Sequence, residues 1–249
     1  MLARPSHGYP DVHVASAKLA AADASAGDVE RAFAKFVETF GGEAVARRRT
    51  KGHRDTAFLF PKEGAVAKLQ KLVSGNGERK RLSTRIHRLF DAWHGKLRLA
   101  ADAVEGSATG DALPARYQRQ LTELHRTILQ RRVVGASRQI KDIAERYRVS
   151  DVRGLLIILD VDGQALDPRA VLFLIWRILG AHFEHIGAIV YCTCVDEPRE
   201  TGRDARSWVW AYATRERVPT VSTRFLDALF DGWCAHMGTV AERRVLGSA

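Results

Sequence analysis

Lys68 and Gln70 are the residues whose types and spacing best suit a chemical role in this sequence. They stand in and just after a strand predicted at 65–69, and strict alternation places both side chains on one face of it. An ammonium and an amide donate hydrogen bonds to phosphate oxygens, whereas a divalent metal ion requires oxygen ligands that usually include carboxylate. The pair therefore favours anion binding over metal binding.

Three carboxylates near this strand offer a different site. Asp55, Glu63 and Glu43 lie before it, in the turn that leads into it and at the start of an earlier strand. Together they could hold Mg²⁺ or Mn²⁺ as acids that have moved from the usual positions of a metal site. The simpler interpretation is that they are exposed acids that pair with neighbouring cations. Those cations are Arg47, Arg54 and Lys62.

The elements that position Lys68 and Gln70 form a helix followed by three strands. A capping pattern at 25–28 begins an amphipathic helix that ends at Gly41-Gly42. A first strand is expected at 43–49 and a second at 56–60, and the turn 61–64 then leads into the strand at 65–69. Pro fixes φ early in this turn, and Gly accepts a positive φ near its end.

A lopsided distribution of charge marks the next predicted helix, 78–99. One side carries an apolar stripe. The other side is more basic than solubility requires, and its cations are Arg79, Lys80, Arg81, Arg85, Arg88 and Lys96. Further helices are expected at 115–130 and 138–147 with a break near 133–137, and the second of these carries Gln139. The region 78–147 thus forms a helical insertion.

The C-terminal third predicts a β-α-β unit. A nearly all-apolar strand at 154–161 is typical of a strand buried on both sheet faces. A helix starts at Pro168 after a cap at Asp167, and a second buried strand follows at 188–195, so the two strands should be parallel. An edge strand near 208–213 and a helix capped by Ser222 complete the pattern.

Composition describes an ordinary globular chain of 249 residues with a formal net charge of +10, which attracts polyanions. No apolar run is long enough to span a bilayer, so no membrane association is expected. We interpret the three cysteines as small buried hydrophobic residues in a reducing cytoplasm. We expect one α/β domain at 25–240 between a disordered tail at 1–24 and a tail at 241–249.

The order of these elements and several short motifs resemble the PD-(D/E)XK nuclease superfamily, in particular an uncharacterised bacterial restriction-endonuclease-like group. The resemblance covers about residues 28–235. The motifs that carry it are TAFLF at 56–60, VAKLQKL at 66–72, RQIK at 138–141, GLLIILDVDG at 154–163, LDPRA at 166–170 and IGAIVYCT at 186–193.

This resemblance implies an α/β fold with a restriction-endonuclease-like α-β-β-β-α-β sandwich core, added helices and a C-terminal βαβ unit. In the family an Asp and a Glu bind Mg²⁺, and a Lys positions the attacking water. The positions that match these here are Ala57, Lys68 and Gln70. The catalytic motif is therefore degenerate, and metal-assisted activation of water has no support. Gln139 matches a helix position near the nuclease cleft in relatives.

Three functions follow from these observations. The first is a catalytically silent nuclease-like domain, without a metal cofactor, that binds DNA or RNA or serves in a larger assembly. Its expected nucleic-acid ligands are Arg54, Lys68, Gln70, Arg79, Lys80, Arg81, Arg85, Arg88 and Gln139. The second is an active Mg²⁺- or Mn²⁺-dependent nuclease that uses the moved acids. The third is a protein-interaction or immunity-type module that binds a partner through Trp208, Trp210 and Tyr212 on an exposed edge.

The sequence offers few other candidate catalytic or ligand-binding residues. Asp160, Asp162 and Asp167 gather at the end of a parallel strand, where α/β sheets often bind ligands, but turn and cap roles explain the last two. His182 and His185 weakly suggest a metal pair, and core or surface roles are favoured for both. Phosphate loops and nucleophile elbows are absent from the sequence.

Overall fold

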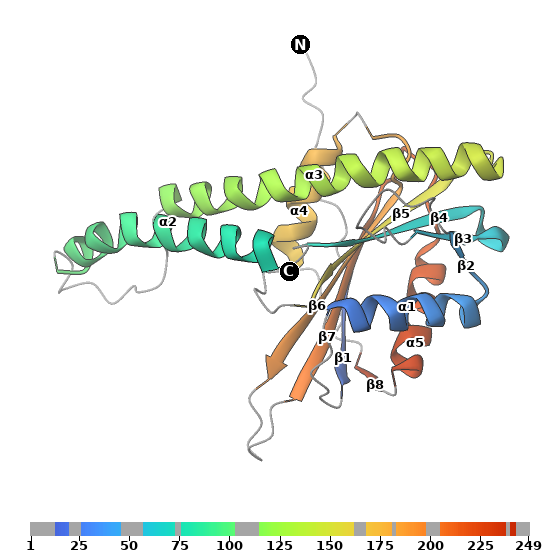
Figure 1. Ribbon diagram of the computed structural model, residues 1–249, viewed down its shortest axis with the longest axis horizontal. Coiled ribbons are helices and arrows are strands. Elements are labelled where there is room, and N and C mark those ends of the chain that lie inside the picture. The colour runs from blue at the N-terminus through green and yellow to red at the C-terminus, as the bar shows by residue number, and fades with distance from the viewer. Residues whose placement is uncertain are drawn as a thin grey trace, which may run out of the picture. The chain divides into compact units, whose positions relative to one another are not determined.

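A computed structural model provides the structure of the protein (Figure 1). It describes residues 13–19, 26–45, 57–72, 76–102, 115–161, 168–180, 183–197, 205–237 and 240–242. The chain divides into two compact units. The first comprises residues 1–71 and 132–249, and the second comprises residues 72–131. The expected helical insertion at 78–147 overlaps the second unit.

In the described part of the chain, eight strands form one mixed sheet in the order β2-β3-β4-β5-β6-β7-β1-β8. The β4–β5 and β5–β6 pairs are parallel and the other pairs are antiparallel. This arrangement confirms the α/β class. The strands are β1 (His13–Leu19), β2 (Glu43–Val45), β3 (Ala57–Phe60), β4 (Ala65–Lys71), β5 (Arg153–Asp160), β6 (Ala188–Glu197), β7 (Ala205–Thr214) and β8 (Val240–Glu242).

The predicted hairpin is confirmed as β3 and β4. Its turn is a short 3-10 helix, η1 (Pro61–Glu63), closed by Gly64 with a φ of 57°. Glycine suits this position because a left-handed conformation is costly for residues with a Cβ. The register pairs Ala57 with Lys68 and Phe60 with Ala65.

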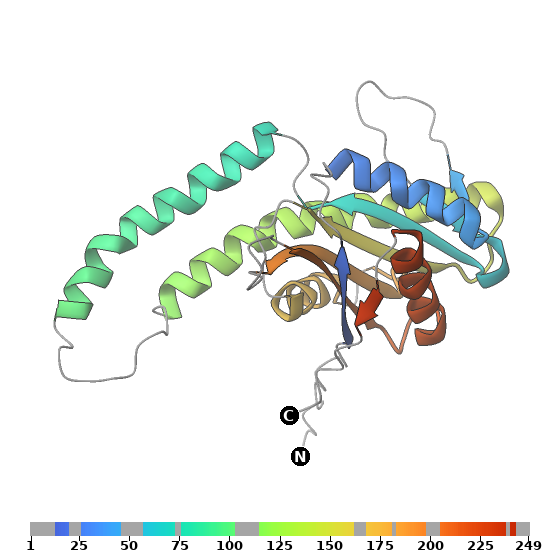
Figure 2. The same cartoon turned by 90° about the horizontal axis from the view of Figure 1, so that it is seen from below.

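One sheet face packs against α1 (Ala26–Phe40) and α5 (Thr223–His236), which lie together on one side of the sheet (Figures 1 and 2). Its core contains Ala65, Ala67 and Leu69 of β4, as the alternation predicts. The Ser222 hydroxyl accepts a hydrogen bond from the Phe225 amide at 3.1 Å, which confirms the predicted helix cap.

The opposite sheet face is covered by α4 (Pro168–Leu179) and by residues 132–147 of α3 (Ala115–Tyr147). A methyl group placed on Gly154 would come within 3.1 Å of the Ile140 side chain, so α3 lies against this part of β5. The predicted β-α-β unit is confirmed as β5, α4 and β6. Arg215 donates to the carbonyls of Gly180 and Phe183 at 2.6 Å each, which ties the end of α4 to the sheet.

The predicted break at 133–137 is wrong, because α3 is one continuous helix. A glycine inside a helix costs only about 1 kcal/mol relative to alanine. Val133, Ala136 and Ile140 are fully buried on one face of this helix. Their burial outweighs the cost of Gly135, since each large apolar side chain contributes about 1.5–3 kcal/mol.

The predicted edge strand is also wrong, because β7 lies between β6 and β1. Its partner β1 falls within the segment 1–24, for which no element was expected, and β8 reaches into the expected tail 241–249. No sequence pattern predicts this pairing, since β1 is a short run without a strong apolar alternation.

Candidate functional site

Ala57, Lys68 and Gln70 share one face of the sheet. Ala57 and Lys68 are direct cross-strand partners, and Gln70 follows two residues later on β4. Lys68 also pairs with Leu156 on β5, and Gln70 pairs with Ile158. The hairpin thus places the three positions side by side, on the face opposite the core formed with α1 and α5.

The burial of Lys68 corrects its expected role. The side chain is 0% exposed, and Ala57 is 3% exposed, so neither lines an open cleft. β4 is an inner strand, and α3 covers the adjacent face of β5. Lys68 therefore cannot contact phosphate in this conformation, whereas Gln70 is half-buried. Alternation predicted the face of the sheet correctly, but it could not predict that a helix covers it.

A buried hydrogen bond lies farther along the same face. The Tyr191 hydroxyl donates to Asp160 Oδ2 at 2.8 Å, and Asp160 is the cross-strand partner of Thr193. All three side chains are buried. Burial raises the pKa of Tyr191, and the nearby Asp160 raises it further. Asp162 and Asp167, which the sequence groups with Asp160, lie outside the described residues.

Sequence reasoning missed Tyr191. The only available signal was alternation along β6, which puts Tyr191 and Thr193 on the face opposite Val190 and Cys192. The sequence predicts 188–195 only as a second buried strand.

We expect Tyr191→Phe to lower the free energy of unfolding at pH 8 by about 1–3 kcal/mol, because a buried carboxyl oxygen loses its donor. The raised pKa also predicts how this difference depends on pH. Above pH 10 the unfolded chain releases the tyrosine proton while the folded chain retains it, so the stability of the wild type declines there. Denaturant unfolding at several pH values should show the difference shrinking above pH 10. A constant difference would contradict the prediction.

The three acids of the alternative metal site are not seen to form a cluster in the described part of the chain. Glu43 is exposed and pairs with Leu59, and Glu63 is half-buried in the turn, where its carbonyl accepts a hydrogen bond from Arg153 at 3.3 Å. Asp55 lies outside the described residues. Among the described residues there is no group of three or more His, Cys, Asp or Glu that could hold a metal ion.

Several described basic residues of the second unit are accessible. Helix α2 (Asn76–Asp102) is drawn as one uninterrupted helix in Figure 2. Four of its cations are exposed and form what we call the α2 basic stripe. The stripe consists of Lys80, Arg81, Arg85 and Arg88. Leu82 of the same helix is buried, so the helix has the two-sided character that the sequence predicts.

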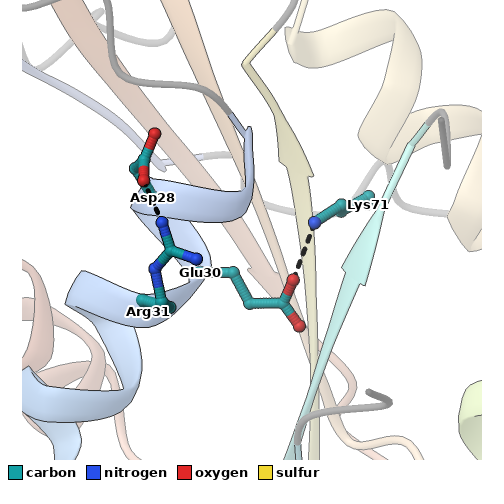
Figure 3. A network of polar contacts seen from close by, with 4 residues as sticks. All are labelled: Asp28, Glu30, Arg31 and Lys71. Atoms are coloured by element: carbon teal, nitrogen blue, oxygen red, sulfur yellow. Dashed lines mark hydrogen bonds and ion pairs between the residues drawn. The ribbon is translucent and has the colours of Figure 1, made fainter. Parts of the chain in front are cut away.

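No ion pair joins the α2 basic stripe to any residue that the structure describes. Other cations differ in this respect (Figure 3). Lys71 of β4 pairs with Glu30 of α1 at 2.7 Å, and Arg31 pairs with Asp28. The stripe therefore presents positive charge without an ion pair to a described acid.

The other residues expected to bind nucleic acid or metal add little to the description of a site. Gln139 is half-buried on α3. Arg54 and the Arg79 side chain lie outside the described part of the chain. His185 and Glu184 line an open hollow of about 590 Å³ together with Arg148, whereas His182 is not described.

The predicted partner-binding surface of exposed aromatic residues is wrong. Trp208, Trp210 and Tyr212 are 3%, 1% and 4% exposed. They face the α1 and α5 core, where Trp210 contacts Phe230 with ring centroids 5.6 Å apart. They cannot bind a partner because they already form the interior.

No described helix is both long and apolar enough to cross a bilayer. Cys192 and Cys234 are buried in the core, which confirms their interpretation as small core residues, whereas the Cys194 side chain lies outside the described part of the chain.

No family model, curated protein or solved structure matches this chain. An assignment of function therefore rests on the residues and the geometry described above.

Proposed function

We propose that this protein is a catalytically silent nuclease-like domain that binds nucleic acid through the α2 basic stripe. The observation that carries the proposal is the presence of four exposed cations within nine consecutive residues of one helix, without an ion-pair partner among the described residues. Phosphate contacts by Lys and Arg supply most non-specific affinity for nucleic acid. The formal net charge of +10 adds long-range attraction.

The scaffold supports the nuclease-like part of the proposal. When β1 and the inserted helix α2 are set aside, the elements follow the order α1, β2, β3, β4, α3, β5, with β4 and β5 parallel. This is the order that the resemblance implies. At the positions where relatives bind Mg²⁺, this chain has Ala57 and Lys68. A methyl group donates no ligand, and an ammonium repels a divalent cation, so a metal-bound water is not expected there.

The burial of Lys68 moves the expected interface from the sheet to the helical insertion. A fully buried ammonium can support the fold, but it does not reach a phosphate. The exposed guanidinium groups of α2 can do so, because each presents several donors in a planar fork that matches phosphate geometry.

A binding assay with a charge-removed variant tests the proposal. We expect the wild type to bind a fluorescent oligonucleotide at about 50 mM salt and to lose affinity steeply towards about 200 mM. The triple variant R81Q/R85Q/R88Q should bind at least about tenfold more weakly, since three phosphate contacts are lost. Glutamine is a good helix former, so the fold should persist.

The matched control is K35Q/R217Q/R224Q, which removes three exposed charges from the first unit. It should retain most of the affinity. An equal loss in both triple variants would attribute binding to net charge alone and would contradict an interface on α2. Cleavage of the oligonucleotide that requires Mg²⁺ or Mn²⁺ and stops with EDTA would contradict the silent character.

A further inference from the structure

We infer that the α2 basic stripe binds the sugar–phosphate backbone of a double helix and does not hold an unpaired strand by base stacking. This inference rests on the proposed function and names the class of nucleic acid that the same surface binds. It depends on the spacing of the cations and on the side chains that lie between them.

The spacing suits a rigid backbone. Arg81, Arg85 and Arg88 stand at i, i+4 and i+7, which places them on one side of the helix. They span about 10 Å along its axis, a length over which one strand of duplex DNA carries about three phosphates. Lys80 flanks the row. A straight row on a helix matches charges that a duplex holds at fixed positions better than those of a flexible strand.

The side chains between the cations offer little for stacking. Proteins that hold single strands without sequence preference combine a basic groove with aromatic side chains on which the bases stack. Between Lys80 and Arg88 the sequence has no Phe, Tyr or Trp, whereas the side chains of Phe90 and Trp93 lie outside the described part of the chain. The large apolar residues that are exposed in the described part of the chain are Tyr147 and Phe173, which belong to the first unit.

The small polar residues next to the stripe are bound to their own helix. The Thr84 hydroxyl donates to the Lys80 carbonyl at 2.7 Å. The His87 ring nitrogen Nδ1 lies 2.8 Å from the Ser83 carbonyl, to which its N–H donates. These groups are therefore directed along α2, and the cations are left as the groups that extend towards a ligand.

Binding of matched oligonucleotides tests the inference. Fluorescence anisotropy would compare a DNA duplex of about 20 bp, an RNA duplex of the same sequence and each separated strand over a range of salt concentrations. We expect a duplex to bind at least about tenfold more tightly than its strands. With four phosphate contacts, the plot of log K against log salt should have a slope of about −3.6 for duplex DNA. In R81Q/R85Q/R88Q the slope should become shallower by about 2.7.

Trp93→Ala distinguishes binding of a duplex backbone from stacking on single-stranded bases. Trp93 is an aromatic residue of α2 that could stack on a base. Duplex preference that persists in this variant supports the inference, and the tighter of the two duplexes identifies the natural source as DNA or RNA. Equal or tighter binding of single strands, weakened by Trp93→Ala, would overturn the inference while leaving the proposed function intact. A failure to bind any of the oligonucleotides would overturn both.

Discussion

Replacing Gly154 by alanine should destabilise the protein severely. An added Cβ would lie 1.7 Å from the backbone carbonyl oxygen of His185, so the main chain of one of the two segments must move. The same segments are joined by a hydrogen bond from the Gly187 amide to the Gly154 carbonyl at 2.9 Å. Overpacking costs about 1–3 kcal/mol even where side chains can adjust, and here the obstacle is backbone. We therefore expect a loss of about 3 kcal/mol or more.

Thermal and denaturant unfolding would measure this loss. For a chain of this size, about 3 kcal/mol corresponds to a decrease of roughly 6–12 °C in the melting temperature. The matched control is Gly135→Ala, where an added Cβ has no neighbour within 4 Å. Because Gly135 lies inside α3, alanine there should stabilise the protein by up to about 1 kcal/mol. Similar behaviour of the two variants would show that the β5 contact with residues 185–187 is not tight.

Lys68→Glu is the second change with a large expected effect. Lys68 is fully buried on an inner strand and takes part in at least one interaction there. Reversal of the charge turns any interaction that favours the ammonium into repulsion and shortens a side chain that fills a closed space. Disruption of a buried charged contact costs about 3–5 kcal/mol, a large part of a total stability of roughly 5–15 kcal/mol.

Lys68→Met serves as the control, because it keeps the length of the apolar stem and removes only the charge. We expect its loss of stability to be smaller than that of Lys68→Glu, since a neutral side chain avoids burying a carboxylate. Unfolding curves in metal-free buffer and with Mn²⁺ would compare the two variants. Native stability of Lys68→Glu, together with a Mn²⁺-dependent increase in its melting temperature, would contradict both the closed environment of Lys68 and the silent scaffold.

Local patterns predicted much of the fold. The helix cap at Ser222, the helix start at Pro168 and the glycine in the hairpin turn follow from backbone requirements that act within a few residues. Alternation assigned Ala67 and Lys68 to opposite faces of β4, and the register agrees. The apolar runs of β5 and β6 predicted a parallel pair because an intervening helix covers the sheet.

The failed predictions all concern partners that are distant in sequence. The edge position of Trp208 and Trp210 depended on what lies beyond β7, and β1, from the start of the chain, fills that place. The break in α3 near Gly135 was a local signal that burial against the sheet overrode. Tyr191 was missed because its partner Asp160 lies 31 residues away on another strand.

The same division applies to the candidate site. Residue types alone show that the hairpin carries Ala57, Lys68 and Gln70 without a carboxylate, and that α2 is strongly basic on one side. That Lys68 is enclosed and that Arg81, Arg85 and Arg88 are exposed follows from the packing of the folded chain. The physical reason is that residue type and periodicity fix which face a side chain occupies, whereas access to solvent depends on which other element covers that face.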